Sequence, residues 1–302
     1  MEGTELKPQS GVVVPNSGAT GMASETKLDH EPEKETRLDT EERRAVEEIG
    51  VFSPSVIFEA IRREGDHELS RPLSALWWSG VAAGLAISCS VLFKGFLTSV
   101  LPDTTWAPAI TNLGYSVGFV IVILAQMQLF TENTITPILP LFLNPTRRNF
   151  SRTARLWGIV FAANLAGCLL AAAVFTKGGI VTAERFAGIL EISRHYAHRS
   201  AEDHFYMGIP AGFLIAALVW IMPRMADSGE VMMIVIITYF IGLGDMSHVV
   251  AGATELFVMV FQGELSVGHA VTSGILPALA GNVLGGTGIF SAMTYAQVRE
   301  EL

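Results

Sequence analysis

The sequence predicts an all-α membrane protein whose six transmembrane helices form an inverted repeat of three plus three, with the second and fifth helices broken. Half of the 302 residues are apolar and only 16% are charged, whereas soluble domains carry about a quarter charged residues. Six apolar segments are each long enough to cross a bilayer, which takes about 20 residues. Two of the six exceed 30 residues and contain polar residues near their middle.

The N-terminal part of the chain differs from the rest in composition. Residues 1–40 are rich in Gly, Ser, Pro, Thr and acidic residues. Such a stretch buries too little apolar surface to offset the entropy of ordering, so it is predicted to be a disordered tail. Residues 1–71 carry nine Lys/Arg and sixteen Asp/Glu, so most of the net charge of −9 lies there. No basic cluster indicates nucleic-acid binding.

Residues 41–72 are predicted to be a cytoplasmic helical segment. The stretch SPSVIFEAIRREG (53–65) begins with a Ser-Pro pair, which is a helix start signal. Helical periodicity puts four apolar residues of this stretch on one face: Val56, Ile57, Ala60 and Ile61. We therefore expect this helix to pack under the membrane domain.

Residues 73–297 are predicted to form the six-span domain, followed by a cytoplasmic C-terminus at 298–302. The apolar segments fall at 74–98, 112–142, 156–176, 205–222, 231–262 and 270–295. As straight helices the second and fifth would be about 46 Å long, at 1.5 Å per residue. Each contains a polar group, TEN at 131–133 and GDMSH at 244–248. Irregular backbone at membrane depth is tolerated only against protein or a water-filled cavity, so both segments are predicted to break there.

The two halves of this domain repeat short motifs of small residues. The first and fourth segments contain GVAAG (80–84) and GIPAG (208–212), and the third and sixth contain ANLAG (163–167) and GNVLGG (281–286). Two copies of three spans have opposite orientations in the membrane. Such inverted repeats place the substrate site where the two broken helices meet, near the bilayer midplane.

Loop charges predict the orientation. The loop NPTRRNFSRTAR (144–155) holds four arginines, whereas the short loops at 99–111 and 263–269 hold no Lys or Arg. The positive-inside rule therefore places both termini in the cytoplasm. The location that we expect is the cytoplasmic (inner) membrane. The 177–204 loop holds four Lys/Arg but is long and also carries acidic residues, so it counts for less in this rule.

His248 is the leading candidate for a functional side chain, because it lies at a predicted break. Ionisable groups at membrane depth usually mark a pathway or a partner. A neutral imidazole can donate a hydrogen bond to an anion. The alternative is a hydrogen-bonded structural histidine. Asp245 either shares a helical face with His248 or fixes the loop.

The other break supplies further candidates. The Thr131 hydroxyl could bond a passing solute or an unwound backbone group, and Glu132 could cap a helix or line a vestibule. Four large apolar residues lie on the broken pair, either as ordinary packing or as a narrow constriction around a polar centre: Leu129, Phe130, Phe119 and Phe240. A constriction of that kind stops ions unless they shed their charge.

The sequence gives little support for an enzyme. His248 and Glu255 are seven residues apart, unlike the HExxH spacing of a zinc protease. Cys89 and Cys168 lie in apolar runs, as small buried cysteines do. We therefore expect no catalytic residue, no metal site and no cofactor.

The motifs resemble those of the formate–nitrite transporter family over about residues 54–297. The resemblance rests on LFTEN (129–133), ANLAG (163–167), the histidine in GDMSHVVAG (244–252) and LPALAGNVLGG (276–286), in the right order and spacing. It implies an aquaporin-like six-span protomer, a homopentamer in the lipid bilayer, and a separate pore in each protomer. It also implies small monovalent weak-acid anions as substrates, such as formate, nitrite, hydrosulfide and short carboxylates.

The resemblance also assigns roles to residues. His248 resembles the central pore histidine and Thr131 the threonine that faces it. The residues that resemble the cytoplasmic constriction are Leu129, Phe130 and Phe119. Tyr115 and Phe240 would lie near the outer constriction.

Several positions depart from the pattern that the family implies. Ser247 stands where a glutamate is expected, with an acidic residue displaced to Asp245. Gly212 and Gly252 stand where asparagines are expected. The outer-loop lysine is missing, with His198 and Arg199 nearby. These positions shape pore electrostatics, so the substrate should not be copied from better-matched members.

The leading hypothesis is transport of a small monovalent weak-acid anion, with or without a proton, that depends on pH at a central histidine. The alternative is a neutral-solute pore for ammonia, glycerol or water. A true aquaporin needs two Asn-Pro-Ala motifs, and the nearest match is NPT at 144–146. The glycines at 212 and 252 slightly favour the neutral pore.

Overall fold

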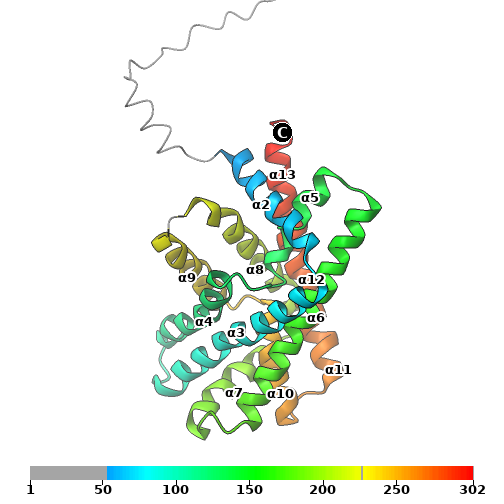
Figure 1. Ribbon diagram of the computed structural model, residues 1–302. Coiled ribbons are helices and arrows are strands. Elements are labelled where there is room, and N and C mark those ends of the chain that lie inside the picture. Colours follow the sequence, from blue (N-terminus) through cyan, green and yellow to red (C-terminus); the bar gives the residue numbers. More distant parts are fainter. Residues whose placement is uncertain (1–52, 226, 302) are drawn as a thin grey trace, which may run out of the picture. The chain divides into compact units, whose positions relative to one another are not determined.

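The computed structural model describes residues 53–225 and 227–301, and every regular element within these ranges is a helix (Figure 1). The tail predicted at 1–40 and the first part of the segment predicted at 41–72 lie outside the described residues. The described residues belong to one compact unit.

The first described helix, α2, runs from Pro54 to Ser70 and begins at the predicted Ser-Pro signal. The Ser53 hydroxyl accepts a hydrogen bond from the Val56 amide, and proline occupies the first turn. The buried face differs from the predicted one: Val56 and Ala60 are exposed, because the face that packs is centred on Ile57, Phe58 and Ile61.

The buried face of α2 packs on the chain that follows the first predicted break. Ile57, Phe58 and Ile61 form a cluster with Ile135 and Leu139. Gly65 allows close approach, because a Cβ there would lie 2.0 Å from the carbonyl oxygen of Thr136. The helix therefore lies directly against one of the two interrupted segments.

Six membrane-spanning segments follow. Their helices are α3 (Leu73–Val100), α4 (Ala107–Leu124) with α5 (Ile138–Leu143), α6 (Arg147–Lys177), α8 (Ala201–Ile221), α9 (Asp227–Leu243) with α10 (Val249–Gln262), and α11 (Val267–His269) continuing through α12 (Leu276–Val283) to α13 (Ala292–Val298). Five continuous helices of the described residues are long and apolar enough to cross a membrane, whereas α9 and α10 are shorter apolar helices.

The second and fifth segments are broken, as predicted. Between α4 and α5 the chain is irregular apart from a short 3-10 turn at Glu132–Thr134. Between α9 and α10 it is irregular at residues 244–248. Each break opens with a residue in the left-handed region, Gln126 with φ 49° and Asp245 with φ 57°.

The inverted repeat is visible in the hydrogen bonds that hold these breaks. The Asn164 amide donates to the carbonyls of Gly80 and Gln128, and its oxygen accepts from the Phe130 amide, all at 2.8–2.9 Å. Asn282 makes the three equivalent contacts in the second half. Each asparagine thus ties a broken segment to the first helix of its own half.

In the second half, the Asn282 amide donates to the carbonyls of Gly208 and Ser247, and its oxygen accepts from the Val249 amide, at 2.7–2.9 Å. Both asparagines are fully buried. Each asparagine satisfies one carbonyl and one amide of a broken segment, which have no helical partner at membrane depth.

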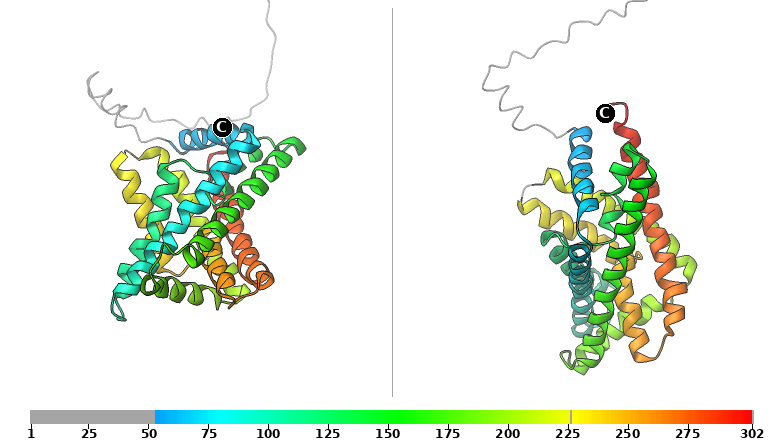
Figure 2. Two further views of the ribbon diagram at one scale, coloured as in Figure 1. Left: turned by 60° about the horizontal axis from the view of Figure 1, so that its bottom comes forward. Right: turned by 45° about the vertical axis from the view of Figure 1, so that its right-hand side comes forward.

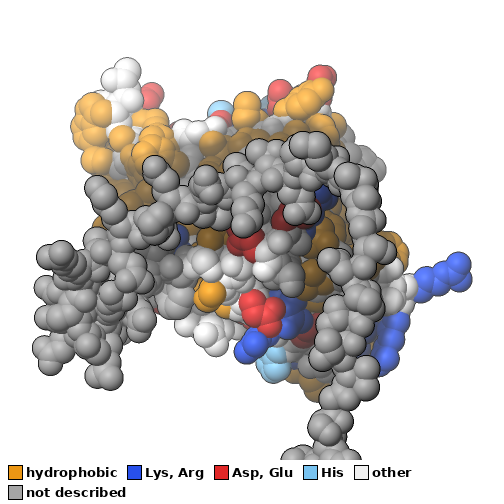
Figure 3. Space-filling view, turned by 90° about the horizontal axis from the view of Figure 1, so that it is seen from above, with side chains coloured by type: hydrophobic (Ala, Val, Ile, Leu, Met, Phe, Trp, Pro, Cys, Tyr) orange, Lys and Arg blue, Asp and Glu red, His pale blue; other side chains and the backbone are white. Residues whose placement is uncertain are grey.

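The two ends of the molecule carry different elements. The Ser55 hydroxyl donates to Glu301, so α2 and the C-terminal end of α13 lie together, with the α5–α6 connection at the same end (Figure 2). That end carries Lys, Arg, Asp and Glu side chains, with hydrophobic side chains around its flanks (Figure 3). The opposite end carries α7 (Ala183–Ala197), a helix within the segment 177–204, which was expected to be a loop.

Candidate functional site

Thr131 and His248 meet where the two broken segments approach each other. The Thr131 hydroxyl lies 2.7 Å from His248 Nε2, and both side chains are buried. His248 is also the N-cap of α10, where its Nδ1 lies 3.2 Å from the Ala251 amide. Since a backbone amide only donates, Nδ1 is the acceptor and the neutral ring carries its proton on Nε2. That proton points at Thr131.

Apolar and aromatic side chains surround this pair. The Phe119 ring meets the His248 ring edge-on at 4.9 Å between centroids. Leu129 and Phe130 precede Thr131 and are buried in the same core cluster as Phe119. Phe130 packs edge-on against Phe161 and Trp157 of α6. The structure therefore brings five of the predicted residues together: Phe119, Leu129, Phe130, Thr131 and His248.

Ser247 is held by the second half of the repeat. Its amide donates to the Met207 carbonyl at 3.1 Å, and its hydroxyl lies 3.2 Å from His204 Nδ1. The ring of His204, on α8, packs at a tilt against Tyr196 of α7, with 4.6 Å between ring centroids. At the position where the family pattern implies a glutamate, this chain thus has a serine hydroxyl in contact with His204.

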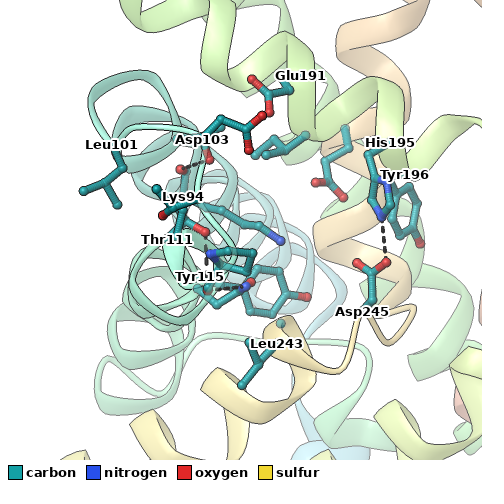
Figure 4. A pocket seen from close by; sticks show the side chains of 18 of the residues that line it. Lys94, Leu101, Asp103, Thr111, Tyr115, Glu191, His195, Tyr196, Leu243 and Asp245 are labelled. Carbon is teal, nitrogen blue, oxygen red and sulfur yellow. Dashed lines mark hydrogen bonds and ion pairs between the residues drawn. The ribbon is translucent and has the colours of Figure 1, made fainter.

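A cavity of about 620 Å³, here called the vestibule, lies at the α7 end of the molecule (Figure 4). Its walls come from the last turns of α3, the start of α4, α7 and the second break. Charged and phenolic side chains line it, among them Lys94, Tyr115, Tyr196, Arg199, Asp245 and Glu255. Asp103 and Leu101, in the connection from α3 to α4, place this cavity at the end opposite α2.

Asp245 links the vestibule to the second break. Its carboxylate pairs with Arg199 and lies 2.6 Å from His195 Nε2, the contact drawn in Figure 4. Arg199 also donates to the Asp245 carbonyl at 2.6 Å. The Lys94 ammonium lies 5.7 Å from the centre of the Tyr115 ring. Tyr115 in turn packs on Phe119, so the vestibule floor is in contact with the aromatic shell of His248.

Two of the predicted residues lie apart from this cluster. Phe240 is 55% exposed and packs edge-on against Tyr239 on α9. Glu132 lies in the 3-10 turn after Thr131, and one of its oxygens is buried without a hydrogen-bond partner among the described residues. No group of three or more His, Cys, Asp or Glu side chains that could hold a metal ion occurs in the described part of the chain.

Sequence reasoning missed several residues of the site. In the sequence, Asn164 and Asn282 stand out only as members of the repeated motifs ANLAG and GNVLGG. Their equivalent positions in the two halves indicate a shared role. Tyr196 and His204 gave no signal, because their parts in the site depend on how α7 folds onto the second break.

Comparisons with known proteins agree with this arrangement. The sequence profile of the family described as Formate/nitrite transporter matches residues 55–296. Inner membrane protein YfdC of Escherichia coli K12 is 39% identical over 246 residues, which cover 82% of this chain and 79% of that protein. Formate channel FocA of Haemophilus influenzae is 23% identical over 69% of this chain and 81% of its own length.

The fold agrees as well. A solved structure described as a pentameric formate channel with formate bound superposes with a TM-score of 0.64 at 17% identity, covering 76% of this chain and 98% of the other. The expected family resemblance and the six-segment fold with two broken helices are thereby confirmed. The chain belongs to the formate/nitrite transporter family.

Proposed function

We propose that each protomer conducts a small monovalent weak-acid anion, of the formate or nitrite kind, through a pore that passes the Thr131–His248 pair. The observation that carries this proposal is the 2.7 Å contact between Thr131 Oγ1 and His248 Nε2, buried among apolar side chains. A hydrogen-bond donor in an otherwise apolar passage recognises an anion without offering a site for a cation.

The geometry supports a short sequence of events. An anion enters the vestibule, whose lining carries Lys94 and Arg199 together with the carboxyl groups of Asp103, Glu191, Asp245 and Glu255. It then passes Phe119 and replaces the Thr131 hydroxyl as the acceptor of the His248 Nε2 proton. The N-terminus of α10 adds the favourable end of a helix dipole at the same place.

Desolvation is the main barrier in this pathway. A full charge at the bilayer centre costs about 2.5–3.5 kcal/mol on insertion scales. Acquiring or sharing a proton near His248 removes much of that cost, so flux should rise on acidification. Because His248 Nδ1 accepts the Ala251 amide, the neutral ring has one proton left to offer to the anion, the proton on Nε2.

We also propose the assembly and orientation that the family implies. The matched formate channel is described as pentameric, and a homopentamer with one pore per protomer is proposed for this chain. The Arg-rich first turns of α6 lie at the same end as α2 and the C-terminus. We therefore place both termini in the cytoplasm and the vestibule on the outer side of the cytoplasmic membrane.

The test is stopped-flow uptake into liposomes that hold the purified protein, with formate, nitrite, hydrosulfide, glycerol and ammonia at two pH values. His248→Asn removes the Nε2 donor, but asparagine is also a good N-cap, so α10 should keep its first turn. We expect anion uptake to rise with acid and to fall about tenfold or more in His248→Asn.

The matched control is His269→Asn, since His269 is exposed on α11. It should leave uptake unchanged. Flux of glycerol or ammonia alone, indifferent to His248→Asn, would reject the anion pathway and make the protein a neutral-solute pore.

A further inference from the structure

Tyr196 occupies a place between the vestibule and the second break that the family resemblance does not assign. It lies near the end of α7, is 6% exposed, and lines the vestibule. Its ring is held on two sides, by His204 at 4.6 Å and by the Arg199 guanidinium at 5.1 Å from the ring centre. These two contacts fix the position of the Tyr196 side chain where it lines the vestibule.

The lack of a side chain at Gly252 leaves room for the Tyr196 ring. A Cβ at position 252 would lie 2.1 Å from the Tyr196 hydroxyl oxygen and 2.2 Å from Cζ. Since real Cβ atoms do not approach so closely, any larger residue would displace the phenol. The family pattern implies an asparagine at this position, so the Tyr196 phenol stands in space that a polar side chain of α10 would otherwise fill.

The phenol lies one helical turn from the pore histidine. The Gly252 amide donates to the His248 carbonyl at 2.9 Å, which makes the two residues neighbours on successive turns of α10. On the other wall of the vestibule, Tyr115 packs on Phe119, and Phe119 contacts His248. In the close-up, Tyr196 and Tyr115 come from different walls of the pocket, α7 and α4 (Figure 4).

We propose that Tyr196 is a specificity-determining residue: its hydroxyl donates a hydrogen bond to the anion leaving the vestibule, and its ring limits the size of the anion that reaches His248. The inference rests on the proposed anion transport. A phenol is neutral and both donates and accepts, so it binds a carboxylate or nitrite without holding it as tightly as a fixed cation would. The asparagine that the family implies at position 252 is thus replaced by a hydroxyl supplied from α7.

Four variants test the two parts of this role. Tyr196→Phe keeps the ring and removes the hydroxyl, and Tyr206→Phe is the matched control on an exposed tyrosine of α8. Tyr196→Ala removes the ring, and Gly252→Ala displaces it. Uptake of formate and of the larger carboxylate lactate is measured for each variant in liposomes, after size-exclusion chromatography confirms intact assembly.

We expect Tyr196→Phe to lower formate uptake about tenfold, the effect of losing one hydrogen bond to a charged group. Tyr206→Phe should match the wild type. Tyr196→Ala should raise the ratio of lactate to formate uptake about fivefold or more, because a cavity replaces the ring. Gly252→Ala should lower formate uptake in the same direction as Tyr196→Phe.

If the wild type takes up formate and Tyr196→Phe takes it up at a rate within twofold of the wild type, the role of Tyr196 is overturned and the proposed function stands. No anion uptake by the wild type would overturn both. Should Tyr196→Ala or Gly252→Ala fail to assemble, the pair Tyr196→Phe and Tyr206→Phe still decides, since both keep the ring and its packing.

Discussion

The break between α4 and α5 and the break between α9 and α10 are built alike in their backbone and differently in their side chains. In each break a backbone amide of the irregular chain donates a hydrogen bond to a buried asparagine. The residue just before that amide holds the equivalent position in the two halves. That residue is Leu129 in the first break and His248 in the second, since the next amides, of Phe130 and Val249, donate to Asn164 and Asn282.

The partners beyond the asparagine also differ. In the first break, Gln128 donates to Glu68 of α2 at 2.8 Å, so a helix at the end of the molecule closes that break. In the second, Ser247 contacts His204, while Asp245 meets Arg199 and His195 in the vestibule. The repeat therefore gives both breaks the same hydrogen bonds between backbone and asparagine. The side chains that differ supply the hydrogen-bond donor of His248 and the charged groups of the vestibule.

The largest expected effect comes from the element that the two breaks share. Asn164→Leu and Asn282→Leu each remove three hydrogen bonds and leave one carbonyl and one amide of the broken segment without a partner, because the carbonyls of Gly80 and Gly208 belong to continuous helices. Buried unsatisfied groups cost about 1–3 kcal/mol each, so either variant should lose about 3 kcal/mol or more and fold poorly. The measurement is the fraction of protein that remains monodisperse in size-exclusion chromatography after heating in detergent.

Asn144→Leu, at an exposed position after α5, is the control and should unfold with the wild type. Similar losses in Asn164→Leu and Asn282→Leu would support equivalent roles. A large loss in one variant and none in the other would contradict the repeat.

Much of the fold follows from the sequence, for physical reasons. Apolar length predicts six segments, and a polar group in an over-long segment predicts its break. The Ser53-Pro54 signal predicts the start of α2. The face of α2 was misjudged by one position, because Val56 and Ala60 are apolar but face outward while Phe58 faces inward. A short amphipathic helix with few apolar residues leaves that choice to its packing partner.

The site could be predicted only in part. His248 and Thr131 are visible as polar residues inside apolar runs, and their meeting follows from the repeat. The vestibule partners are different, because Tyr196, Arg199 and His195 belong to a polar loop whose charge alone suggests a solvated surface. Their role depends on how α7 packs, which no local periodicity reports.

A second prediction compares the unique partners of the two breaks. Gln128→Leu removes the hydrogen bond to the Glu68 carboxylate, and Ser247→Ala removes the contact with His204. Hydrogen bonds to charged groups contribute about 1.5–3 kcal/mol and neutral ones about 1 kcal/mol. Gln128→Leu should therefore lower the midpoint of thermal unfolding more than Ser247→Ala. The reverse order would mean that α2 contributes little to closing the first break.

A third prediction uses the two left-handed residues. Gln126→Gly should stabilise the protein by up to about 1 kcal/mol, because glycine relieves the cost of positive φ. Asp245→Gly relieves the same cost but removes the carboxylate that pairs with Arg199 and His195, so it should not stabilise. Both variants are compared by thermal unfolding, and equal stabilisation would show that the Asp245 ion pairs contribute nothing.

The smallest expected effect concerns the surface of α2, the helix that closes only the first break. The Arg62 and Arg63 guanidinium groups lower the pKa of Glu59 from 4.5 to about 2. A carboxyl whose pKa is lower in the folded state contributes stability that is present above pH 4.5 and is lost as pH falls towards 2. Because these side chains are partly exposed, the contribution should be below about 1 kcal/mol.

Glu59→Gln should therefore lower the unfolding midpoint slightly at pH 7, and the difference from the wild type should shrink as pH falls from 4.5. Glu264→Gln gives the corresponding comparison at the other end of the molecule. There Arg194 lowers the pKa of the exposed Glu264, and with one arginine in place of two the same pH dependence should be weaker still. A difference that grows on acidification in either variant would reverse the sign that these ion pairs require.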